Sequence, residues 1–301
     1  MDRLGAMEMF VRIVETGSFS AVARQLGTTQ PTISKQLTAL EKQLQTRLLH
    51  RSTRSLGLTE AGAAYYERCR RIIDEVREAE AALGRLQTGL AGTLHVNASI
   101  ALGQIFLAPL VLKFQRQYPA LGIELSLIDR YIDLVEEGVD VAVRIGQLAD
   151  SNLVARRLGS TRRVLVATPA YLAAHGTPER PEDLVHHNCL LYAYLSTGNE
   201  WLFNGPEGEL RVRVHGSFRA NNGHVIREAV LAGVGVALTP DWLAHDKLES
   251  GEVVALLPQF AAPPLEINAV YPSARHVSAK VRAFVEFLRA EFAAIPAFAA
   301  Q

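Results

Sequence analysis

The stretch GTTQPTISKQL, residues 27–37, decides how the N-terminal part of this chain is interpreted. Thr29 suits the N-cap of a helix, and Pro31 fits the first turn, where a missing N–H costs nothing. Apolar residues follow at helical spacing, which predicts one buried face. The predicted buried face consists of Ile33, Leu37, Leu40 and Leu44.

Two segments before this helix also have helical spacing. Residues 4–14 predict a first helix that stops at Gly17, a residue suited to the left-handed conformation after a helix end. Ser18 suits the N-cap of a second helix of about two turns, closed by Gly27. Two short helices joined by such a turn are typical of a helix-turn-helix, and a small helical bundle with a polar surface is the alternative. The predicted apolar face of the second helix consists of Phe19, Val22, Ala23 and Leu26.

The chain has 31 basic and 31 acidic residues, but its charge is unevenly placed. Between residues 20 and 59 six basic residues stand against one acid, Glu41, so this stretch carries +5 and the rest of the chain −5. A localised basic patch suits a polyanion, although a solvated helical face is the alternative. Residues 48–59 predict two extended segments around a turn, a β-wing with arginines directed toward DNA.

These patterns predict a set of DNA contacts. Gln30 can pair with adenine, hydroxyl groups can reach phosphates or bases, and Lys35 adds a phosphate contact. The predicted DNA-binding residues are Ser18, Thr29, Gln30, Pro31, Thr32, Ser34, Lys35, Thr38, Arg51, Thr53 and Arg54.

A third feature is a heptad pattern that begins after Thr59, which suits the N-cap of a long helix. The 3.5-residue spacing favours pairing with a second copy of the helix, hence a dimer and a palindrome-like operator. An amphipathic helix packed on its own domain is the alternative. We expect Cys69 to be a small buried hydrophobic side chain without chemistry. The predicted dimerisation residues are Tyr65, Cys69, Ile72, Val76, Ala79, Leu83, Leu86 and Leu90.

After a Gly-containing hinge the pattern changes to alternating strands and helices. Strands are predicted at 93–98, 122–129, 139–146, 163–168, 188–194, 210–215, 234–239 and 265–271, with a loop at 204–206. Helices are predicted at 104–117, 131–138, 224–232 and 277–292. This alternation predicts a mostly parallel sheet covered by helices, in two lobes with a ligand cleft at strand ends.

Three groups of residues are candidates for holding a ligand in that cleft. Ser99 and the residues after it lie between a predicted strand and a predicted helix, where the Ser99 hydroxyl and backbone N–H groups could bind a ligand carboxylate. Capping of the helix by Ser99 is the alternative role. Asn221 and Asn222 occupy a corresponding turn, and Arg144 is a candidate counter-charge or a partner in a structural ion pair. The predicted effector-binding residues are Ser99, Ile100, Ala101, Leu102, Arg144, Asn221, Asn222 and His224.

Composition and motifs narrow the remaining function classes. A 301-residue chain with 49% hydrophobic residues can form two or three domains. No apolar run reaches the roughly 18 residues of a membrane span, and no signal peptide is visible, so we expect a cytoplasmic protein. The two cysteines, Cys69 and Cys189, lie far apart in the sequence, so we expect both to be reduced thiols. We expect His186 and His187 to lie in a solvated loop rather than to bind a metal, and no cofactor is expected. The sequence contains neither a phosphate-binding loop nor a motif for a catalytic nucleophile, so we do not expect the protein to be an enzyme.

The N-terminal residues resemble the LysR-type transcriptional regulators. The resemblance rests on Phe10, Gly17-Ser18-Phe19-Ser20, Ala23, Leu26, Gln30-Pro31, Ser34, Leu40-Glu41, Leu44, Leu48, Arg51 and Leu58-Thr59-Glu60-Ala61-Gly62. Gln45, Leu49 and Val22 depart from the family pattern at positions of packing and helix ending. Farther along, residues 140–146 and 229–240 carry a looser resemblance.

The resemblance implies an α/β chain with an N-terminal winged helix-turn-helix, a long linker helix and a two-lobed, periplasmic-binding-protein-like effector domain. The implied limits are 1–58 for DNA binding, 59–88 for the linker, 89–92 for the hinge and 93–301 for the effector domain. Lobe one is expected at 93–161 and 268–301, and lobe two at 162–267.

The implied function is ligand-responsive regulation of transcription by a small, anionic effector. The expected partners are double-stranded DNA, the effector and identical chains in a dimer or tetramer; contact with RNA polymerase stays open. An architectural DNA-binding protein and a solute-binding protein with a helical extension are the alternative functions.

Overall fold

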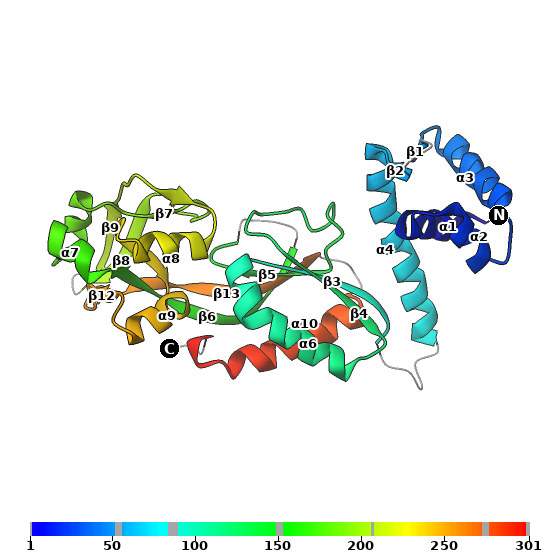
Figure 1. The fold of residues 1–301 in the computed structure, drawn as a ribbon. Helices are drawn as coiled ribbons and strands as arrows, with labels where there is room; N and C mark the ends of the chain where they lie inside the picture. Colours follow the sequence, from blue (N-terminus) through cyan, green and yellow to red (C-terminus); the bar gives the residue numbers. More distant parts are fainter. Residues whose placement is uncertain are drawn as a thin grey trace. The chain divides into compact units, whose positions relative to one another are not determined.

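The computed structural model describes residues 2–51, 56–83, 90–148, 153–205, 208–272 and 277–298. The chain divides into two compact units, shown as ribbons in Figure 1. The smaller unit comprises Met1–Thr93 with Glu136–Gly138, and the larger unit comprises Leu94–Val135 with Val139–Gln301. This division does not separate a linker or a hinge, so those finer limits stay predictions.

The smaller unit contains the predicted helices and wing. Its elements are α1 (Arg3–Thr16), α2 (Phe19–Gln25), α3 (Gln30–Leu44), β1 (Leu49–Arg51), β2 (Leu56–Leu58) and α4 (Glu60–Leu83), with β1 and β2 antiparallel. Gly17 ends α1 at φ 60°, and the Ser18 hydroxyl accepts a hydrogen bond from the Ala21 N–H, as predicted. The prediction for Thr29 is wrong in one respect: its side chain does not cap α3, because its hydroxyl is bonded to that of Thr32 at 2.8 Å.

One hydrophobic core holds α1, α2, α3 and the start of α4 together. Phe10, Ile13, Val22, Ile33 and Leu37 are fully buried in it. The prediction that Leu26 belongs to the apolar face of α2 is wrong. The helix ends at Gln25, and the Leu26 side chain remains 43% exposed.

The first part of α4 packs on its own unit. The Thr59 hydroxyl accepts the Gly62 N–H at 2.9 Å and so caps α4, as predicted. Cys69 is fully buried in the core, and the Tyr65 ring packs tilted against Phe10 with ring centroids 5.6 Å apart. The placement of Cys69 in an intersubunit seam is therefore wrong, because a side chain with no exposed surface cannot contact a partner. Its burial as a small hydrophobic side chain is confirmed.

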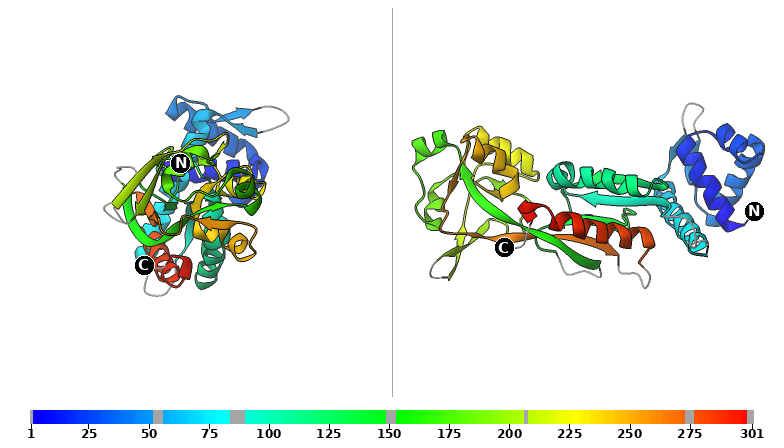
Figure 2. Two further views of the ribbon diagram at one scale, coloured as in Figure 1. Left: turned by 90° about the vertical axis from the view of Figure 1, so that its left-hand side faces the viewer. Right: turned by 90° about the horizontal axis from the view of Figure 1, so that it is seen from below.

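The larger unit is built on a sheet whose central strands run through both lobes (Figure 2). Its strands are β3 (Gly92–Ala98), β4 (Leu121–Leu127), β5 (Val141–Ile145), β6 (Leu153–Ala167), β11 (Ala237–Pro240), β12 (Val254–Leu256) and β13 (Ala262–Pro272). Their order is β11-β6-β13-β5-β3-β4, and β12 also pairs with β6. The prediction of a mostly parallel sheet is wrong for the described pairings: β3 and β5 are parallel, whereas β13 lies antiparallel to both β5 and β6.

Lobe one is formed around β3, β4 and β5. Its helical segments are α5 (Ile100–Leu102), the π-helical turn η1 (Gly103–Leu107), α6 (Ala108–Gln117), α10 (Ala279–Ala293) and η3 (Pro296–Phe298). Helices α6 and α10 lie side by side, with the rings of Phe114 and Phe284 5.0 Å apart (Figure 1). The predicted helix at 131–138 is wrong, because this segment forms turns that end at Gly138 with φ 68°.

Lobe two is formed around the far ends of β6 and β13. Its other elements are α7 (Pro169–His175), η2 (Pro181–His186), β7 (Leu191–Tyr192), β8 (Glu200–Gly205), β9 (Gly208–Arg213), β10 (Arg219–Ala220), α8 (Gly223–Leu231) and α9 (Asp241–Glu249). The predicted strands at 188–194 and 234–239 are shorter, as β7 and β11, and helices α7 and α9 were not predicted. The loop predicted at 204–206 is wrong for Asn204 and Gly205, which end strand β8 and pair with β9, while residue 206 lies outside the described residues.

Candidate functional sites

The exposed side of α3 collects most of the predicted DNA contacts. Its buried side chains, Ile33, Leu37 and Leu40, hold the helix on the core, so the opposite face is free to meet a groove. Ser34 is half-buried, and Ser18 is committed to capping α2. The predicted contact residues with exposed side chains are Thr29, Gln30, Pro31, Thr32, Lys35 and Thr38.

The one acid of the basic stretch has a structural role that the sequence did not reveal. The Glu41 carboxylate accepts the N–H groups of Leu48 and Leu49 at 2.8 and 3.2 Å, which ties α3 to the start of the wing. Its charge is thereby engaged inside the unit. The exposed cations of the stretch, Arg24, Lys35, Lys42 and Arg47, therefore dominate its outer surface.

The wing is described only in part. β1 and β2 pair with Leu49 opposite Leu58, as the prediction of two extended segments requires. Thr53 and Arg54 lie outside the described residues, and so does the side chain of Arg51. Their DNA contacts stay a prediction.

The dimerisation residues divide along α4. Cys69 and Tyr65 pack inward, whereas Ile72 is 40% exposed and Val76 is half-buried. Ile73, which lies off the predicted heptad positions, is buried in the core of the unit. Leu86 and the side chains of Ala79 and Leu83 lie outside the described residues, while Leu90 is half-buried beyond the helix.

A cavity of about 500 Å³ lies between the two lobes of the larger unit, and we call it the cleft. Lobe one contributes Ser99, Asp129 and Tyr131 to its wall, and the far side is rich in aromatic side chains. These are Tyr192, Tyr194, Trp201 and Trp242. The size and the mixed apolar and polar wall are typical of a site for a small organic ligand.

The structure brings only some of the predicted effector residues to the cleft wall. Ser99, Ala101 and Leu102 line it. Asn221 lies at the surface, where its amide reaches the Tyr194 hydroxyl at 3.5 Å. The residues that do not line the cleft are Ile100, Arg144, Asn221, Asn222 and His224.

Asp129 occupies the place where a carboxylate of the effector was expected. One of its oxygens accepts the Ile100 N–H at 2.9 Å, and the other accepts the Asn222 side-chain amide at 2.7 Å. Asn222 also caps α8 by accepting the Val225 N–H. The backbone donor after Ser99 is therefore already engaged, and the Asp129 carboxylate joins lobe one to lobe two.

Arg144 stands behind the cleft wall rather than in it. Its guanidinium donates to the Ile128 carbonyl at 3.3 Å and lies over the Tyr131 ring at 5.9 Å. The side chain is 8% exposed, and its Nη2 has no hydrogen-bond partner among the described residues. Burial lowers the pKa of Arg144, and the neighbouring Tyr131 and Asp129 act in the opposite direction. Arg144 thus offsets the charge of Asp129.

Two further cleft residues were missed by the sequence analysis. Arg163 of β6 lines the cleft and donates through Nε to the Pro263 carbonyl at 2.9 Å. Gln147 of lobe one bonds Ser196 of lobe two at 3.2 Å, which makes a second tie across the cleft. No sequence signal distinguished Arg163 from the neighbouring Arg162, because only tertiary contacts decide which of them faces inward.

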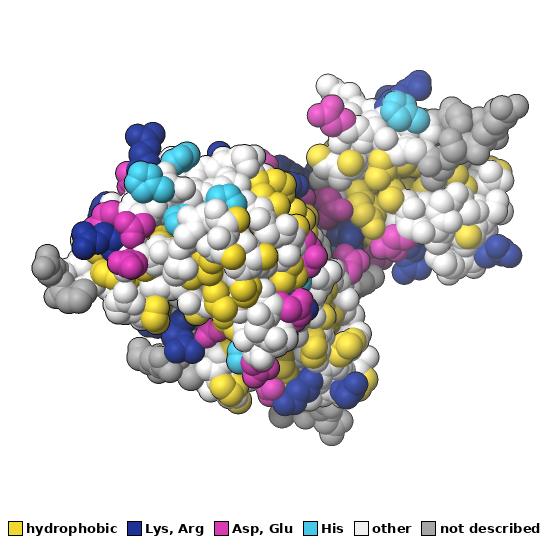
Figure 3. All heavy atoms as spheres, turned by 60° about the vertical axis from the view of Figure 1, so that its left-hand side comes forward, with side chains coloured by type: hydrophobic (Ala, Val, Ile, Leu, Met, Phe, Trp, Pro, Cys, Tyr) yellow, Lys and Arg dark blue, Asp and Glu magenta, His cyan; other side chains and the backbone are white. Residues whose placement is uncertain are grey.

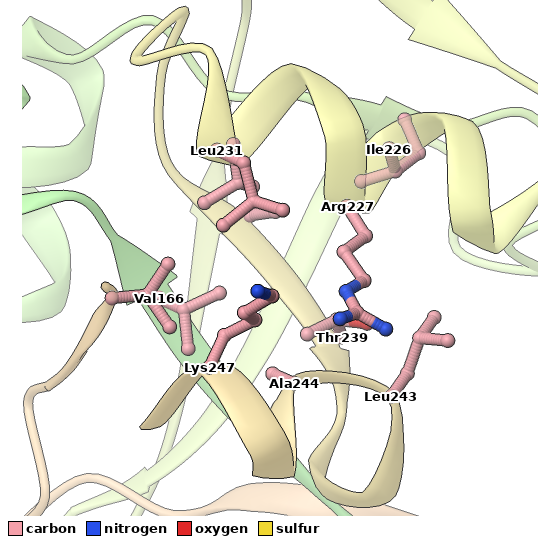
Figure 4. Close-up of a pocket in the computed structure, with 11 residues that line it drawn as sticks. Val166, Ile226, Arg227, Leu231, Thr239, Leu243, Ala244 and Lys247 are labelled. Atoms are coloured by element: carbon pink, nitrogen blue, oxygen red, sulfur yellow. The ribbon is translucent and has the colours of Figure 1, made fainter. Parts of the chain in front are cut away.

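A second void, shown in Figure 4, is too small to hold a ligand. It measures about 10 Å³ between α8, α9, β6 and β11, roughly the size of one water molecule. Val166, Ile226 and Leu243 lie along its wall. Arg227 and Lys247, which also border it, are engaged with Asp246 and Glu252. We interpret it as a packing gap.

The described residues also bear on the expectations for metal binding, for the histidine loop and for membrane insertion. They contain no group of three or more His, Cys, Asp or Glu side chains arranged to hold a metal. The prediction that His187 lies in a solvated loop is wrong: the ring is 6% exposed and lies 3.3 Å from the Tyr171 hydroxyl. None of the described helices is both long and apolar enough to cross a bilayer. Hydrophobic side chains do reach the visible face of the larger unit (Figure 3).

Comparison with known proteins gives matches to both parts of the chain. Residues 4–63 match the model of the bacterial regulatory helix-turn-helix protein, lysR family, and residues 87–293 match the LysR substrate binding domain. An HTH-type transcriptional regulator of Xanthomonas campestris pv. campestris (strain 8004) is 41% identical over 284 residues, covering 93% of this chain and 83% of that protein. The HTH-type transcriptional activator AaeR of Escherichia coli (strain K12) is 37% identical, covering 96% and 93%.

A solved structure agrees with these sequence matches. CrgA, a LysR-type transcriptional regulator from Neisseria meningitidis, gives a TM-score of 0.60 at 36% identity. The alignment covers 96% of this chain and 98% of CrgA. The similarity therefore extends over both units.

Proposed function

This chain belongs to the LysR family of ligand-responsive, helix-turn-helix transcriptional regulators, and on that basis we propose that occupancy of its cleft governs how paired copies of α3 engage an operator. The observation that carries the proposal is one chain that combines an exposed, basic recognition helix with a cleft between two lobes. Binding, rather than catalysis, is the function that this combination supports. A ligand that binds one arrangement of the lobes better than another shifts the equilibrium between them.

Within this proposal the residues of α3 have different tasks. Gln30 reads a base edge near the start of the helix, because a Gln side chain can form two hydrogen bonds with adenine. Lys35, which is exposed one turn later, contacts a phosphate. The arginines at 51 and 54 extend the contact into the wing.

Self-association of the chain supplies a second copy of the recognition helix α3. The exposed Ile72 on α4 and the exposed Ile105 and Leu112 on the helices of lobe one support the proposal of two apolar contact surfaces. A dimer with a twofold axis would bind a palindrome-like operator. Whether dimers pair further, and whether they contact RNA polymerase, are open parts of the proposal.

Titration of the intergenic DNA next to the gene for this protein tests the division of tasks. Lys35→Ala should weaken binding to operator and random duplex alike, and should reduce the salt slope by about 0.9 per lost phosphate contact in each subunit. Gln30→Ala should lower the preference for operator over random duplex about tenfold. Lys113→Ala serves as control, because this exposed lysine of the larger unit pairs with Glu291. Equal salt slopes for Lys35→Ala and Lys113→Ala would contradict the proposed interface.

A further inference from the structure

The cleft has one anion position that the chain itself fills. The Asp129 carboxylate lies between the N–H of Ile100 and the side-chain amide of Asn222, and each of its oxygens accepts one of these donors. A ligand carboxylate placed beside it would meet a like charge within a few ångströms, which is unfavourable in a partly buried site. An anionic ligand must therefore find its counter-charge elsewhere in the cleft.

Arg163 provides that counter-charge. Its bond from Nε to the Pro263 carbonyl fixes the plane of the guanidinium, and the two Nη groups remain for a bidentate contact. No carboxylate among the described residues forms an ion pair with it, and burial alone lowers its pKa, to about 10. The guanidinium therefore stays charged at neutral pH.

The other charged side chains of the cleft wall are the carboxylates Asp129 and Glu266. Asp129 is offset by Arg144 behind the wall. Glu266 also lines the cleft, but its side chain is 57% exposed and forms an ion pair with Arg157 at 4.0 Å. Among the described residues of the wall, Arg163 is thus the one cationic side chain, and it forms no ion pair with a described carboxylate.

The wall around Arg163 also indicates the body of the ligand. Aromatic rings from Tyr192, Tyr194, Trp201 and Trp242 face the same cavity, and such rings favour flat, polarisable groups. A cavity of about 150 Å³ is enough to hold benzene, so the cleft at about 500 Å³ has room for one or two rings with substituents.

We propose that the cleft binds an aromatic carboxylate whose carboxyl group pairs with Arg163, while Asp129 keeps anions away from the ends of α5 and α8. This rests on the proposed effector role of the cleft and names the chemical class of its ligand. The carboxylate gains two charge-assisted hydrogen bonds, and the ring replaces water at an aromatic wall.

Benzoate and the uncharged benzamide form a matched pair of probes. Both tryptophans of the chain, Trp201 and Trp242, line the cleft, so intrinsic fluorescence reports its occupancy directly. We expect saturable quenching by benzoate, and about tenfold weaker binding of benzamide. Arg163→Met should lower benzoate affinity about tenfold or more and leave benzamide affinity unchanged, and Arg163→Lys should keep part of the preference.

Arg162→Met is the control, because Arg162 is the next residue on β6 but pairs outside the cleft with Asp241 at 2.9 Å. It should bind both probes as the parent does. Equal affinity for benzoate and benzamide, no fluorescence change with benzoate, or unchanged benzoate binding by a folded Arg163→Met would overturn the inference. Operator binding is measured on the same samples without ligand. Because operator binding does not require Arg163, its loss would contradict the proposed function, whereas intact operator binding with failed benzoate binding would contradict this inference alone.

Discussion

At the scale of single residues, Asp129 is the side chain of the larger unit that links its two lobes by a charged hydrogen bond. Its carboxylate joins Ile100 to Asn222, which lies 93 residues farther along the chain. A hydrogen bond to a charged group in a partly buried site is stronger than a neutral surface bond. The bond between Gln147 and Ser196 also crosses the cleft, but it is neutral and exposed. We therefore expect Asp129 to account for more of the interlobe stability.

Replacing this carboxylate tests that expectation. Asp129→Ala should lower the free energy of unfolding by about 1–3 kcal/mol, because the Ile100 N–H loses its acceptor and Arg144 loses its counter-charge. Ser196→Ala should cost less than about 1 kcal/mol. Added formate should restore part of the thermal stability of Asp129→Ala, whereas formamide should not, since the vacated position is an anion site. Equal responses to formate and formamide would contradict this role.

At the scale of elements, the junction between the wing and α4 depends on one glycine. Gly62 packs so closely on the chain before β1 that a Cβ atom would lie 1.9 Å from the Leu48 carbonyl oxygen. The same oxygen accepts the Thr59 N–H at 3.0 Å, so the start of α4 is fixed to the start of the wing. A glycine in the first turn of a helix is required here by close backbone approach.

Substitution of this glycine has a predictable effect. Gly62→Ala should destabilise the smaller unit by about 1–3 kcal/mol or more, because backbone, rather than a flexible side chain, must move to admit the methyl group. Gly57→Ala is the control: no atom of the described residues lies within 4 Å of the place its methyl group would take, and its φ is not in the left-handed region. Urea unfolding followed by far-UV circular dichroism measures both. Similar stability of the two variants would show that the junction is looser than described.

Two glycines of lobe two have a comparable packing role. Gly235 lies against the Asn188 carbonyl, where a Cβ would approach to 2.0 Å, and Gly233 adopts φ 71° at the end of α8. The close approach lets the Val236 N–H reach the Asn188 oxygen at 2.9 Å. The glycine at 235 therefore serves the pairing of this segment with residue 188.

At the scale of the whole molecule, the proposed function requires that two copies of the chain associate. The smaller unit leaves Ile72 40% exposed, while the adjacent Ile73 is buried in its core. This contrast separates a side chain available to a partner from one needed for folding. In the proposed dimer the same helix contributes to both tasks with different faces.

A charge on the exposed face should weaken association without unfolding the chain. Ile72→Glu should shift sedimentation toward the monomer. It should also reduce operator affinity, since each dimer places two helix-turn-helix units on the DNA. Ala63→Glu puts the same charge at an exposed position on the opposite side of α4 and should leave association unchanged. An Ile72→Glu variant that sediments like the parent would remove this face from the interface.

Local sequence signals were sufficient for much of the smaller unit. Gly17 and Ser18 ended and began helices as predicted, and Ile33, Leu37 and Leu40 are buried as their spacing required. These features depend on backbone conformation and helical periodicity, which neighbouring residues determine. The same spacing could not tell whether Cys69 faced a partner or its own core, because both are apolar environments.

The sequence by itself determined the helices of the smaller unit, where charge accumulates, and to which family pattern the chain corresponds. Tertiary structure alone decided that β6 and β13 cross both lobes, that Asp129 meets Asn222, and that Arg163 rather than Arg144 lines the cleft. The physical reason is that these contacts join residues far apart in the chain. Their side chains meet only after the sheet has set the register of its strands.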